Sequence, residues 1–267
     1  MSTLKQFIEG HARLFVLTGA GCSTDSGIPD YRDAEGSWKR VRPMLLESFL
    51  GEPLARKRYW ARSLAGWRRF REARPNEAHR ALARLEATGC IERLVTQNVD
   101  GLHQAAGSSA VIDLHGRLDR VRCMECGAIL RREDLQCELL RLNPAWSRLE
   151  AAEGPDGDAE LDGLDFSRFD VPACACCGGI LKPDVVFFGE RVPAERVEAA
   201  MGALERADAM LVIGSSLMVY SGYRFAYVAA QASKPIAAVN LGRTRADQLL
   251  TLKVEQRCAS ALACLES

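Results

Sequence analysis

The sequence has little that would place it in a membrane or in the secretory pathway. No run of apolar residues approaches about 20, the length that a membrane helix needs. The opening segment, MSTLKQFIEGHARLF, shows no basic region followed by a long apolar stretch and a small-residue cleavage site, so it does not predict a secretory signal. We therefore expect no membrane partner and a cytoplasmic, reducing setting in which cysteines remain free thiols.

Net charge is also absent, because 35 Lys and Arg balance 35 Asp and Glu. Without an overall field, direct binding to nucleic acid is not expected. The charges are unevenly distributed, however. Residues 38–80 carry twelve basic residues against four acidic ones, with apolar residues at helical spacing, and predict a helical insertion with a basic outer face. Residues 150–170 hold eight acidic residues and one Arg, which indicates a surface loop.

With 267 residues, 48% of them hydrophobic, the chain can form one large domain and a small satellite. Short apolar runs alternate with helical periodicity, which predicts an α/β fold with a parallel sheet covered by helices on both faces. We expect strands at Leu14–Thr18, Ile91–Thr96, Ala110–Leu114, Asp184–Phe188, Met210–Gly214 and Pro235–Asn240. Helices are expected at Pro193–Ala207 and Tyr220–Ala232.

The first expected strand runs directly into the turn Gly19-Ala20-Gly21-Cys22-Ser23-Thr24. A glycine-rich turn between a strand and a helix start lets backbone amides approach a pyrophosphate. Thr24 stands where the third glycine of the usual pattern would be, so an ordinary tight turn is the alternative. The string continues as GIPDYRD, which predicts a loop placed to close over a nucleotide.

Polar residues also follow the next two expected strands, where open α/β sheets bind ligands. The second strand ends in TQNVDGLH, residues 96–103, although Asn98 or Asp100 could instead cap a helix. The third ends at His115, which can take a proton near neutral pH. A lone histidine is more often structural, and His103 competes for the role of base. We expect the remaining two histidines, His11 and His79, to lie on surface helices.

Four cysteines predict a zinc ribbon. Cys123-x-x-Cys126 and Cys174-x-x-Cys177 each run into glycine and supply two knuckles of a tetrahedral site. Because sulfur fills all four positions, the Zn²⁺ is expected to be structural. The spacing leaves Cys176 as a neighbouring or spare thiol.

Two later turns also follow apolar strands. Gly214-Ser215-Ser216 and Asn240-Leu241-Gly242 offer amides and hydroxyls to a ribose or phosphate. Ordinary helix capping explains each turn about as well.

Taken in order, the strings GAGCSTDSGIPDYRD, TQNVDGLH, LHG, the paired C-x-x-C motifs, LKPDVVFFGE, GSSL and NLG resemble the sirtuins, the NAD-dependent protein lysine deacylases. The resemblance spans essentially the whole chain. The segments SLMVYSGYRF and NLGRTRADQL are similar to the class II branch, which includes the lipoamidase-type mitochondrial sirtuins.

The resemblance implies a Rossmann-like NAD-binding domain of residues 1–36, 77–120 and 183–267. It also implies a small domain made of a helical insertion, 37–76, and a zinc ribbon, 121–182. NAD and an acyl-lysine protein or peptide would be the partners, and we expect a monomer.

The resemblance also implies roles for individual residues. The pyrophosphate turn and closing loop would contain Gly19, Ala20, Gly21, Ser23, Thr24, Asp30, Tyr31 and Arg32. The nicotinamide ribose and carboxamide would be held by Gln97, Asn98 and Asp100, and the adenosine half by Gly214, Ser215, Ser216, Asn240, Leu241, Gly242 and Cys258. The peptide backbone would pair with Val185, Val186, Phe187 and Phe188.

In the mechanism that the resemblance implies, the acyl-lysine oxygen displaces nicotinamide from NAD and forms an alkylimidate. His115, as general base, takes a proton from a ribose hydroxyl, with Asn98 as the second catalytic residue. The acyl group moves to ADP-ribose, and free lysine is released.

One stretch departs from a known pattern. A branch that removes succinyl or malonyl groups is expected to show Tyr and Arg after the phosphate turn, but here the stretch reads Gly36-Ser37-Trp38-Lys39-Arg40. Lys39, Arg40 and Arg42 make this region basic, so we hypothesise a preference for acyl groups longer than acetyl, including acidic ones. The alternative functions are a protein mono-ADP-ribosyltransferase and an NAD-sensing or zinc-ribbon binding module without turnover.

Overall fold

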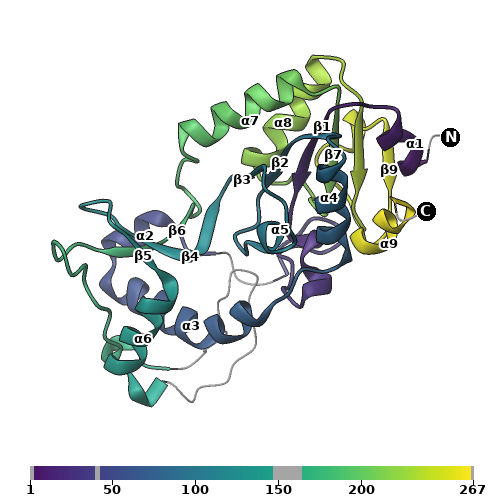
Figure 1. Ribbon diagram of the computed structural model, residues 1–267. Helices are drawn as coiled ribbons and strands as arrows, with labels where there is room; N and C mark the ends of the chain where they lie inside the picture. The colour runs from purple at the N-terminus through teal and green to yellow at the C-terminus, as the bar shows by residue number, and fades with distance from the viewer. Residues whose placement is uncertain (1–2, 40–42, 147–163, 266–267) are drawn as a thin grey trace. The chain divides into compact units, whose positions relative to one another are not determined.

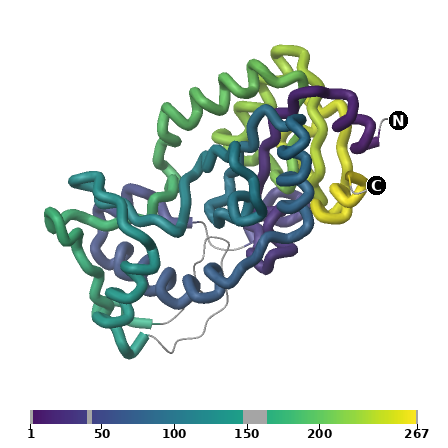
Figure 2. The backbone as a smooth tube through the Cα atoms, viewed as in Figure 1, coloured from purple at the N-terminus to yellow at the C-terminus, as the bar shows by residue number. Residues whose placement is uncertain are grey.

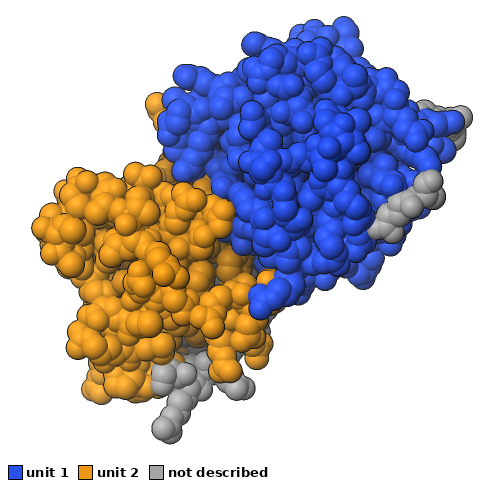
Figure 3. All heavy atoms as spheres, viewed as in Figure 1, with its two compact units in different colours: residues 1–41, 74–115, 192–267 blue, residues 42–73, 116–191 orange. Residues whose placement is uncertain are grey.

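The computed structural model of the chain describes residues 3–39, 43–146 and 164–265. The chain forms two compact units, coloured separately in Figure 3. Unit 1 comprises residues 1–41, 74–115 and 192–267, and unit 2 comprises 42–73 and 116–191. Arg40, Arg42 and most of the acidic segment 150–170 lie outside the described residues.

A six-stranded parallel sheet forms the centre of unit 1, in the order β3-β2-β1-β7-β8-β9. The strands are β1 (Leu14–Thr18), β2 (Ile91–Thr96), β3 (Val111–Asp113), β7 (Ala209–Ile213), β8 (Ile236–Val239) and β9 (Leu252–Val254). This confirms the predicted α/β class. The sequence did not predict β9, because three residues that include a lysine carry no readable alternation.

Helices cover both faces of this sheet (Figure 1). The helices of unit 1 are α1 (Leu4–Glu9), α4 (Glu77–Ala87), α5 (Leu102–Ala105), α7 (Ala194–Arg206), α8 (Tyr220–Gln231) and α9 (Cys258–Leu262). Residues of α1, α4 and α9 pack with Leu14 and Val16 of β1, whereas residues of α7 and α8 pack with Phe15 and Leu17. Since β1 is buried on both faces, a continuous apolar run is what such a strand requires.

The sheet order reverses beside β1. The chain moves outward from β1 to β2 and β3, then returns to β7 on the opposite side of β1. The carboxyl ends of β1 and β7 therefore flank the switch point at which open α/β sheets bind ligands. Figure 2 shows both chain ends on the same side of unit 1, where α1 packs against the short η6 helix (Ala263–Leu265).

Unit 2 combines helices with an antiparallel sheet in the order β5-β4-β6. Its elements are α2 (Leu46–Gly51), α3 (Pro53–Glu72), β4 (Gly116–Cys123), β5 (Ile129–Arg131), α6 (Arg132–Leu142) and β6 (Leu181–Val185). The fully buried Trp60 of α3 donates its indole N–H to the carbonyl oxygen of Leu181 at 3.2 Å. This hydrogen bond connects α3 to β6 of the antiparallel sheet, whose strand β4 ends at Cys123.

Two sequence predictions are wrong. The strand expected at Asp184–Phe188 does not belong to the parallel sheet, because Leu181–Val185 pairs antiparallel with β4 in unit 2. An apolar run does not reveal which sheet receives it. His11 follows the end of α1 rather than lying in a helix, and His79 is fully buried at the start of α4. No helix among the described residues is long and apolar enough to cross a membrane.

Candidate functional site

The turn after β1 is bound directly to the end of β7. Gly19 donates its amide to the oxygen of Ile213 at 3.0 Å, and Gly21 donates to Gly214 at 2.9 Å. Gly214 has a φ of +64°, and a Cβ on it would overlap the amide of Cys22. Glycine is therefore required where the two turns meet. The segment Ala20–Cys22 forms a 3₁₀ turn rather than the start of an α-helix.

Three polar side chains predicted from sequence meet at this turn. Asn98 donates through Nδ2 to the carbonyl oxygen of Gly19 at 3.0 Å and to Ser23 Oγ at 3.1 Å. Ser23 Oγ donates in turn to Asp100 Oδ2 at 2.6 Å. The other oxygen of Asp100 accepts from the amide of Leu102 at 2.9 Å, so Asp100 also caps α5. One carboxylate thus bonds both to the turn after β1 and to the first amide of α5.

Gln97 links the ends of β2 and β7. Its Nε2 donates to Ser215 Oγ at 2.7 Å. Gly222 of α8 makes this possible, because a Cβ there would overlap the Gln97 amide oxygen. Ser215 Oγ also accepts from the amide of Leu217 at 3.2 Å, which is a local bond within the turn after β7.

His115 follows β3 at the same edge of the sheet. Its Nδ1 lies 3.0 Å from the carbonyl oxygen of Gln97, and its Nε2 lies 2.8 Å from Ser221 Oγ. Because a carbonyl only accepts, Nδ1 carries the proton, and the Nε2 lone pair accepts from the Ser221 hydroxyl. Burial lowers the pKa of His115 to about 4, so the ring is neutral at pH 7 with its basic nitrogen at Nε2.

His103, the competing candidate, lies deeper in unit 1. It is 1% exposed, and its Nε2 lies 2.8 Å from Thr18 Oγ1. Burial lowers the pKa of His103 well below its ordinary value. The geometry therefore assigns His103 to the core and leaves His115 as the more accessible base.

The loop after the phosphate turn is closed mostly on itself. Arg32 donates to the oxygen of Gly36 at 2.6 Å and lies 3.9 Å from the centre of the Trp38 ring. Asp30 pairs with Lys39 at 2.5 Å. The polar groups of Asp30 and Arg32 thus bond within the loop rather than to Ser23 or Asn98.

Predicted cofactor residues of the turn after β8 and of α9 (Cys258–Leu262) contact the loop and the turn that follow β1. A Cβ on Gly242 would lie 2.6 Å from the Ala34 Cα, so the turn after β8 packs on the closing loop. Asn240 donates through Nδ2 to the oxygen of Gly242 at 2.9 Å, while Leu241 is 62% exposed. Cys258 is buried, and its Sγ donates to the carbonyl oxygen of Gly21 at 3.4 Å.

In unit 2, the segment that follows β6 is held by an ion pair between the buried Lys182 and the half-buried Glu190. Lys182 Nζ donates to the oxygen of Val185 at 2.5 Å and to Glu190 Oε2 at 3.0 Å. The same carboxylate oxygen accepts from the amide of Phe187 at 2.8 Å, and Leu46 donates to the oxygen of Phe188 at 2.9 Å. The backbone of Phe187 and Phe188 is therefore partly bonded within the unit.

Four cysteine sulfurs in unit 2 converge as the spacing predicted, from Cys123, Cys126, Cys174 and Cys177. Two of the sulfur–sulfur distances are 3.5 Å, between Cys123 and Cys177, and 3.8 Å, between Cys126 and Cys174. A tetrahedron with Zn–S bonds of about 2.3 Å has edges of about 3.8 Å, so the donor set fits Zn²⁺. Cys176 is exposed and stands outside this group.

A second group of possible ligands, Cys22, His79 and His103, has ligand atoms within 4.8 Å of one another. His79 Nδ1 accepts from the amide of Asn76 at 3.3 Å, so the neutral ring carries its proton on Nε2. His79 then has no lone pair for a metal, and burial raises the pKa of the Cys22 thiol well above its ordinary value. We interpret this group as packed core.

Sequence reasoning missed three side chains at this edge: Ser221, Asn76 and His79. Nothing local marks Ser221, because its partner His115 is 106 residues away. Asn76 and His79 do carry a signal in the sequence. They are three residues apart, which is the spacing of a capping box, and each side chain can bond to the backbone of the other residue.

Comparison with known proteins gives matches along the chain. A model of the Sir2 family matches residues 19–221. The chain is 66% identical over 263 residues to the NAD-dependent protein deacetylase of Xanthomonas campestris pv. campestris, covering 98% of this chain and 90% of that protein. It is 65% identical over 263 residues to NAD-dependent protein deacetylase 2 of Bradyrhizobium diazoefficiens, covering 98% and 96%.

Solved structures match over the same length. A Sir2 protein bound to a p53 peptide and NAD⁺ is 32% identical, with a TM-score of 0.79, and the match covers 99% of this chain and 97% of that one. A second, with 2′-O-acetyl-ADP-ribose, the inhibitor EX-527 and a deacetylated p53 peptide, is 30% identical with a TM-score of 0.77, covering 98% and 97%.

Proposed function

Because the chain belongs to the Sir2 family and is an NAD-dependent protein deacylase, we propose that the carboxyl edge of its six-stranded sheet binds NAD, with His115 as the general base. The observation that carries the proposal is the neutral His115 ring, whose Nδ1–H is held by the Gln97 carbonyl and whose Nε2 faces a hydroxyl. In the neutral ring the Nε2 lone pair is available to accept a proton from a hydroxyl in the reaction.

The donor set at this edge fits a dinucleotide. The turn Gly19–Thr24 lies at the switch point, where its backbone amides can bind the pyrophosphate. Gln97, Asn98 and Asp100 hold the nicotinamide ribose and carboxamide. The adenosine half takes the turns at 214–216 and 240–242, where the exposed Leu241 offers an apolar surface for the base.

His115 then acts on a hydroxyl of the NAD ribose. NAD is consumed as a substrate, supplying the carbon that receives the acyl oxygen and releasing nicotinamide. His115 Nε2 exchanges the Ser221 hydroxyl for a ribose hydroxyl and accepts its proton, while the Gln97 carbonyl stabilises the protonated ring through Nδ1–H. The deprotonated ribose oxygen attacks the acyl carbon, the lysine amine leaves, and one water from solvent supplies the remaining oxygen of acyl-ADP-ribose.

The acylated peptide binds to unit 2 as an added strand. β6 is an edge strand of its sheet, and edge strands accept extended peptides through backbone bonds. Because backbone groups of Val185, Phe187 and Phe188 already have internal partners, we place the pairing mainly at Val186. The four-cysteine zinc site stabilises the same sheet.

The preferred acyl group is longer than acetyl. Support comes from the basic residues Lys39, Arg40 and Arg42 in the stretch after the phosphate turn. Of these the structure describes only Lys39, which forms an ion pair with Asp30. A panel of acetyl, glutaryl, hydroxymethylglutaryl, lipoyl and long-chain acyl-lysine peptides, compared by kcat/KM, tests this preference. An acetyl-lysine peptide that wins by about tenfold, a difference of about 1.4 kcal/mol, would contradict it.

The His115→Ala variant tests the assignment of the base. We expect formation of deacylated peptide and acyl-ADP-ribose, measured by mass spectrometry, to fall by about 10²–10⁴-fold. His11→Ala, at a histidine outside the sheet edge, serves as the matched control and is expected to keep parental rates. An unchanged rate in His115→Ala overturns the assignment. A labelled protein adduct without acyl-ADP-ribose would indicate mono-ADP-ribosyl transfer instead.

A further inference from the structure

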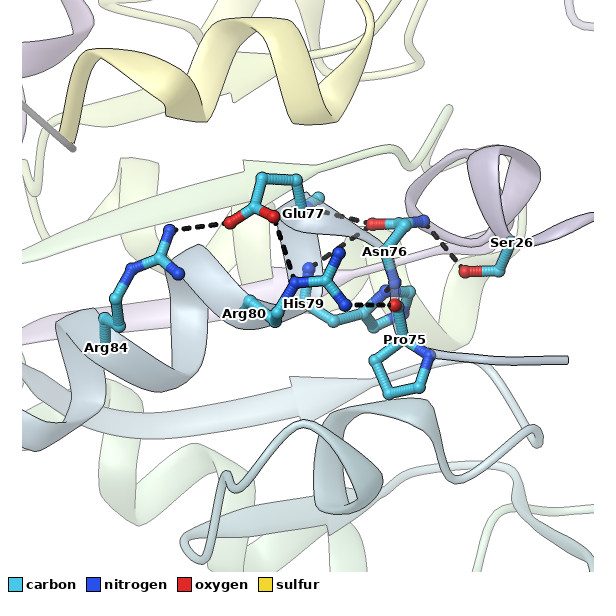
Figure 4. Close-up of polar contacts among 8 residues, drawn as sticks. Ser26, Pro75, Asn76, Glu77, His79, Arg80 and Arg84 are labelled. Atoms are coloured by element: carbon cyan, nitrogen blue, oxygen red, sulfur yellow. Dashed lines mark hydrogen bonds and ion pairs between the residues drawn. The ribbon is translucent and has the colours of Figure 1, made fainter.

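The N-terminus of α4 is attached to the phosphate turn, Gly19–Thr24, and to Ser26 through the side chain of Asn76. Asn76 caps α4, because its Oδ1 accepts from the amides of Ala78 at 2.9 Å and His79 at 3.4 Å. Its Nδ2 points the other way and donates to the carbonyl oxygen of Cys22 at 2.8 Å and to Ser26 Oγ at 3.0 Å. Figure 4 shows Asn76 between the helix and Ser26.

The residue type matters for this double role. Asp and Ser cap helices as well as Asn does, but an ionised Asp has no hydrogen-bond donor. Only an amide supplies an acceptor for the helix and two donors for the turn. Asn76 is 8% exposed, so water does not replace these bonds readily.

His79 makes a second connection from the same helix turn. Its ring is fully buried, and burial lowers its pKa to about 4. With Nδ1 accepting from the Asn76 amide, Nε2–H is directed at Ser23 Oγ, 3.4 Å away. Ser23 then has two incoming donors, Asn98 and His79, and gives its own hydrogen to Asp100. His79 thus fixes the direction of the Ser23 hydroxyl.

We propose that Asn76 and His79 are positioning residues for NAD: they hold the phosphate turn and the Ser23 hydroxyl in the binding conformation without touching the cofactor. The inference rests on the proposed function, since it concerns the same edge of the sheet. It adds the N-cap residue of α4, Asn76, which lies 54 positions from Cys22 in the chain. It also adds His79 of α4, which lies 56 positions from Ser23.

The test compares paired substitutions at each position. His79→Leu removes the donor, whereas His79→Gln keeps an N–H near the position of Nε2. Asn76→Asp keeps the cap and removes both donors. We expect His79→Leu and Asn76→Asp to raise the KM for NAD about tenfold, leaving the KM for acyl-peptide within about twofold, and His79→Gln to restore most of the loss. Circular dichroism thermal melts check folding.

Glu77→Gln is the matched control. Glu77 lies on the same helix turn and pairs with Arg80 at 2.9 Å and Arg84 at 2.8 Å, facing away from the phosphate turn (Figure 4). We expect both KM values of this variant to stay at the parental level. An unchanged KM for NAD in the folded His79→Leu and Asn76→Asp variants overturns the inference. An equal rise in both KM values also overturns it, since that indicates general damage. A parent protein without NAD-dependent deacylation would instead contradict the proposed function.

Discussion

At the residue scale, burial decides the protonation of the catalytic candidate. The neutral form of His115 is favoured by its removal from water, and its two nitrogens are distinguished by a carbonyl on one side and a hydroxyl on the other. The sequence shows a histidine after a strand, but tautomer and pKa depend on neighbours that the fold supplies. Ser221 contributes because its O–H bond stabilises the neutral ring.

The pH profile of the reaction should report this environment. A base works in its deprotonated form, so activity falls as pH drops through the pKa of His115. With that pKa lowered from 6.5 to about 4, we expect the acid limb of kcat/KM for the acyl-peptide to lie well below pH 6.5. Steady-state rates of nicotinamide release between pH 4 and pH 8 measure it.

Replacing Ser221 with Ala should move the acid limb upward, because the neutral ring loses a hydrogen-bond donor. Tyr227→Phe, on the exposed side of α8, provides the control with no expected shift. If the acid limb of the pH profile lies at or above pH 6.5 in the parent protein, or if Ser221→Ala does not move it, His115 is not the base in the described tautomer.

At the scale of elements, the segment after β6 depends on one buried cation. Lys182 is 3% exposed, contacts the Phe187 ring at 4.6 Å from its centre, and bonds to Val185 and Glu190. Phe187 in turn packs edge-on against Phe49 of α2. The ion pair therefore shapes the stretch proposed to receive the peptide.

Breaking this pair should weaken peptide binding. Lys182→Met leaves the half-buried Glu190 carboxylate without its cation and removes the donor to the Val185 carbonyl. We expect a higher KM for the acyl-peptide with little change in the KM for NAD, and a smaller effect for Lys182→Arg. Glu138→Gln, in an exposed pair on α6, is the control. Equal KM values for peptide in parent and Lys182→Met would refute this role.

At the scale of the whole molecule, the two units depend on different forces. Unit 1 has a sheet buried on both faces, whereas unit 2 gathers four sulfurs at the ends of small elements. Three of the four tryptophans, Trp60, Trp67 and Trp146, belong to unit 2. Tryptophan fluorescence therefore reports mainly on the unit that contains the zinc site.

We expect about one Zn²⁺ per chain by elemental analysis, and a red shift of the tryptophan emission when a chelator removes it. Cys126→Ser should lose the metal and reproduce the shift. Cys176→Ser should keep both metal and emission, since Cys176 stands outside the sulfur group. Loss of zinc in Cys176→Ser, or an emission unaffected by chelation, would contradict this assignment.

Strands and ligand pairs could be predicted from the sequence alone where the residues that define them are neighbours in the chain. β1 and β2 have the predicted bounds: β1 is buried at all five positions, as a continuous apolar run requires, and β2 is buried at Ile91 and from Leu94 to Thr96. The zinc ligands followed from the spacing of two C-x-x-C pairs, and the turn at residues 19–21 from glycines that directly follow an apolar strand.

Only the tertiary structure decided which distant residues meet. It placed the LKPDV strand in unit 2, buried His79 beside Ser23, and brought Ser221 to His115. Hydrogen bonds and burial between residues 56 or 106 positions apart leave no periodicity in the chain. They exist because the parallel strands end at one edge of the sheet, and that arrangement is a property of the folded molecule.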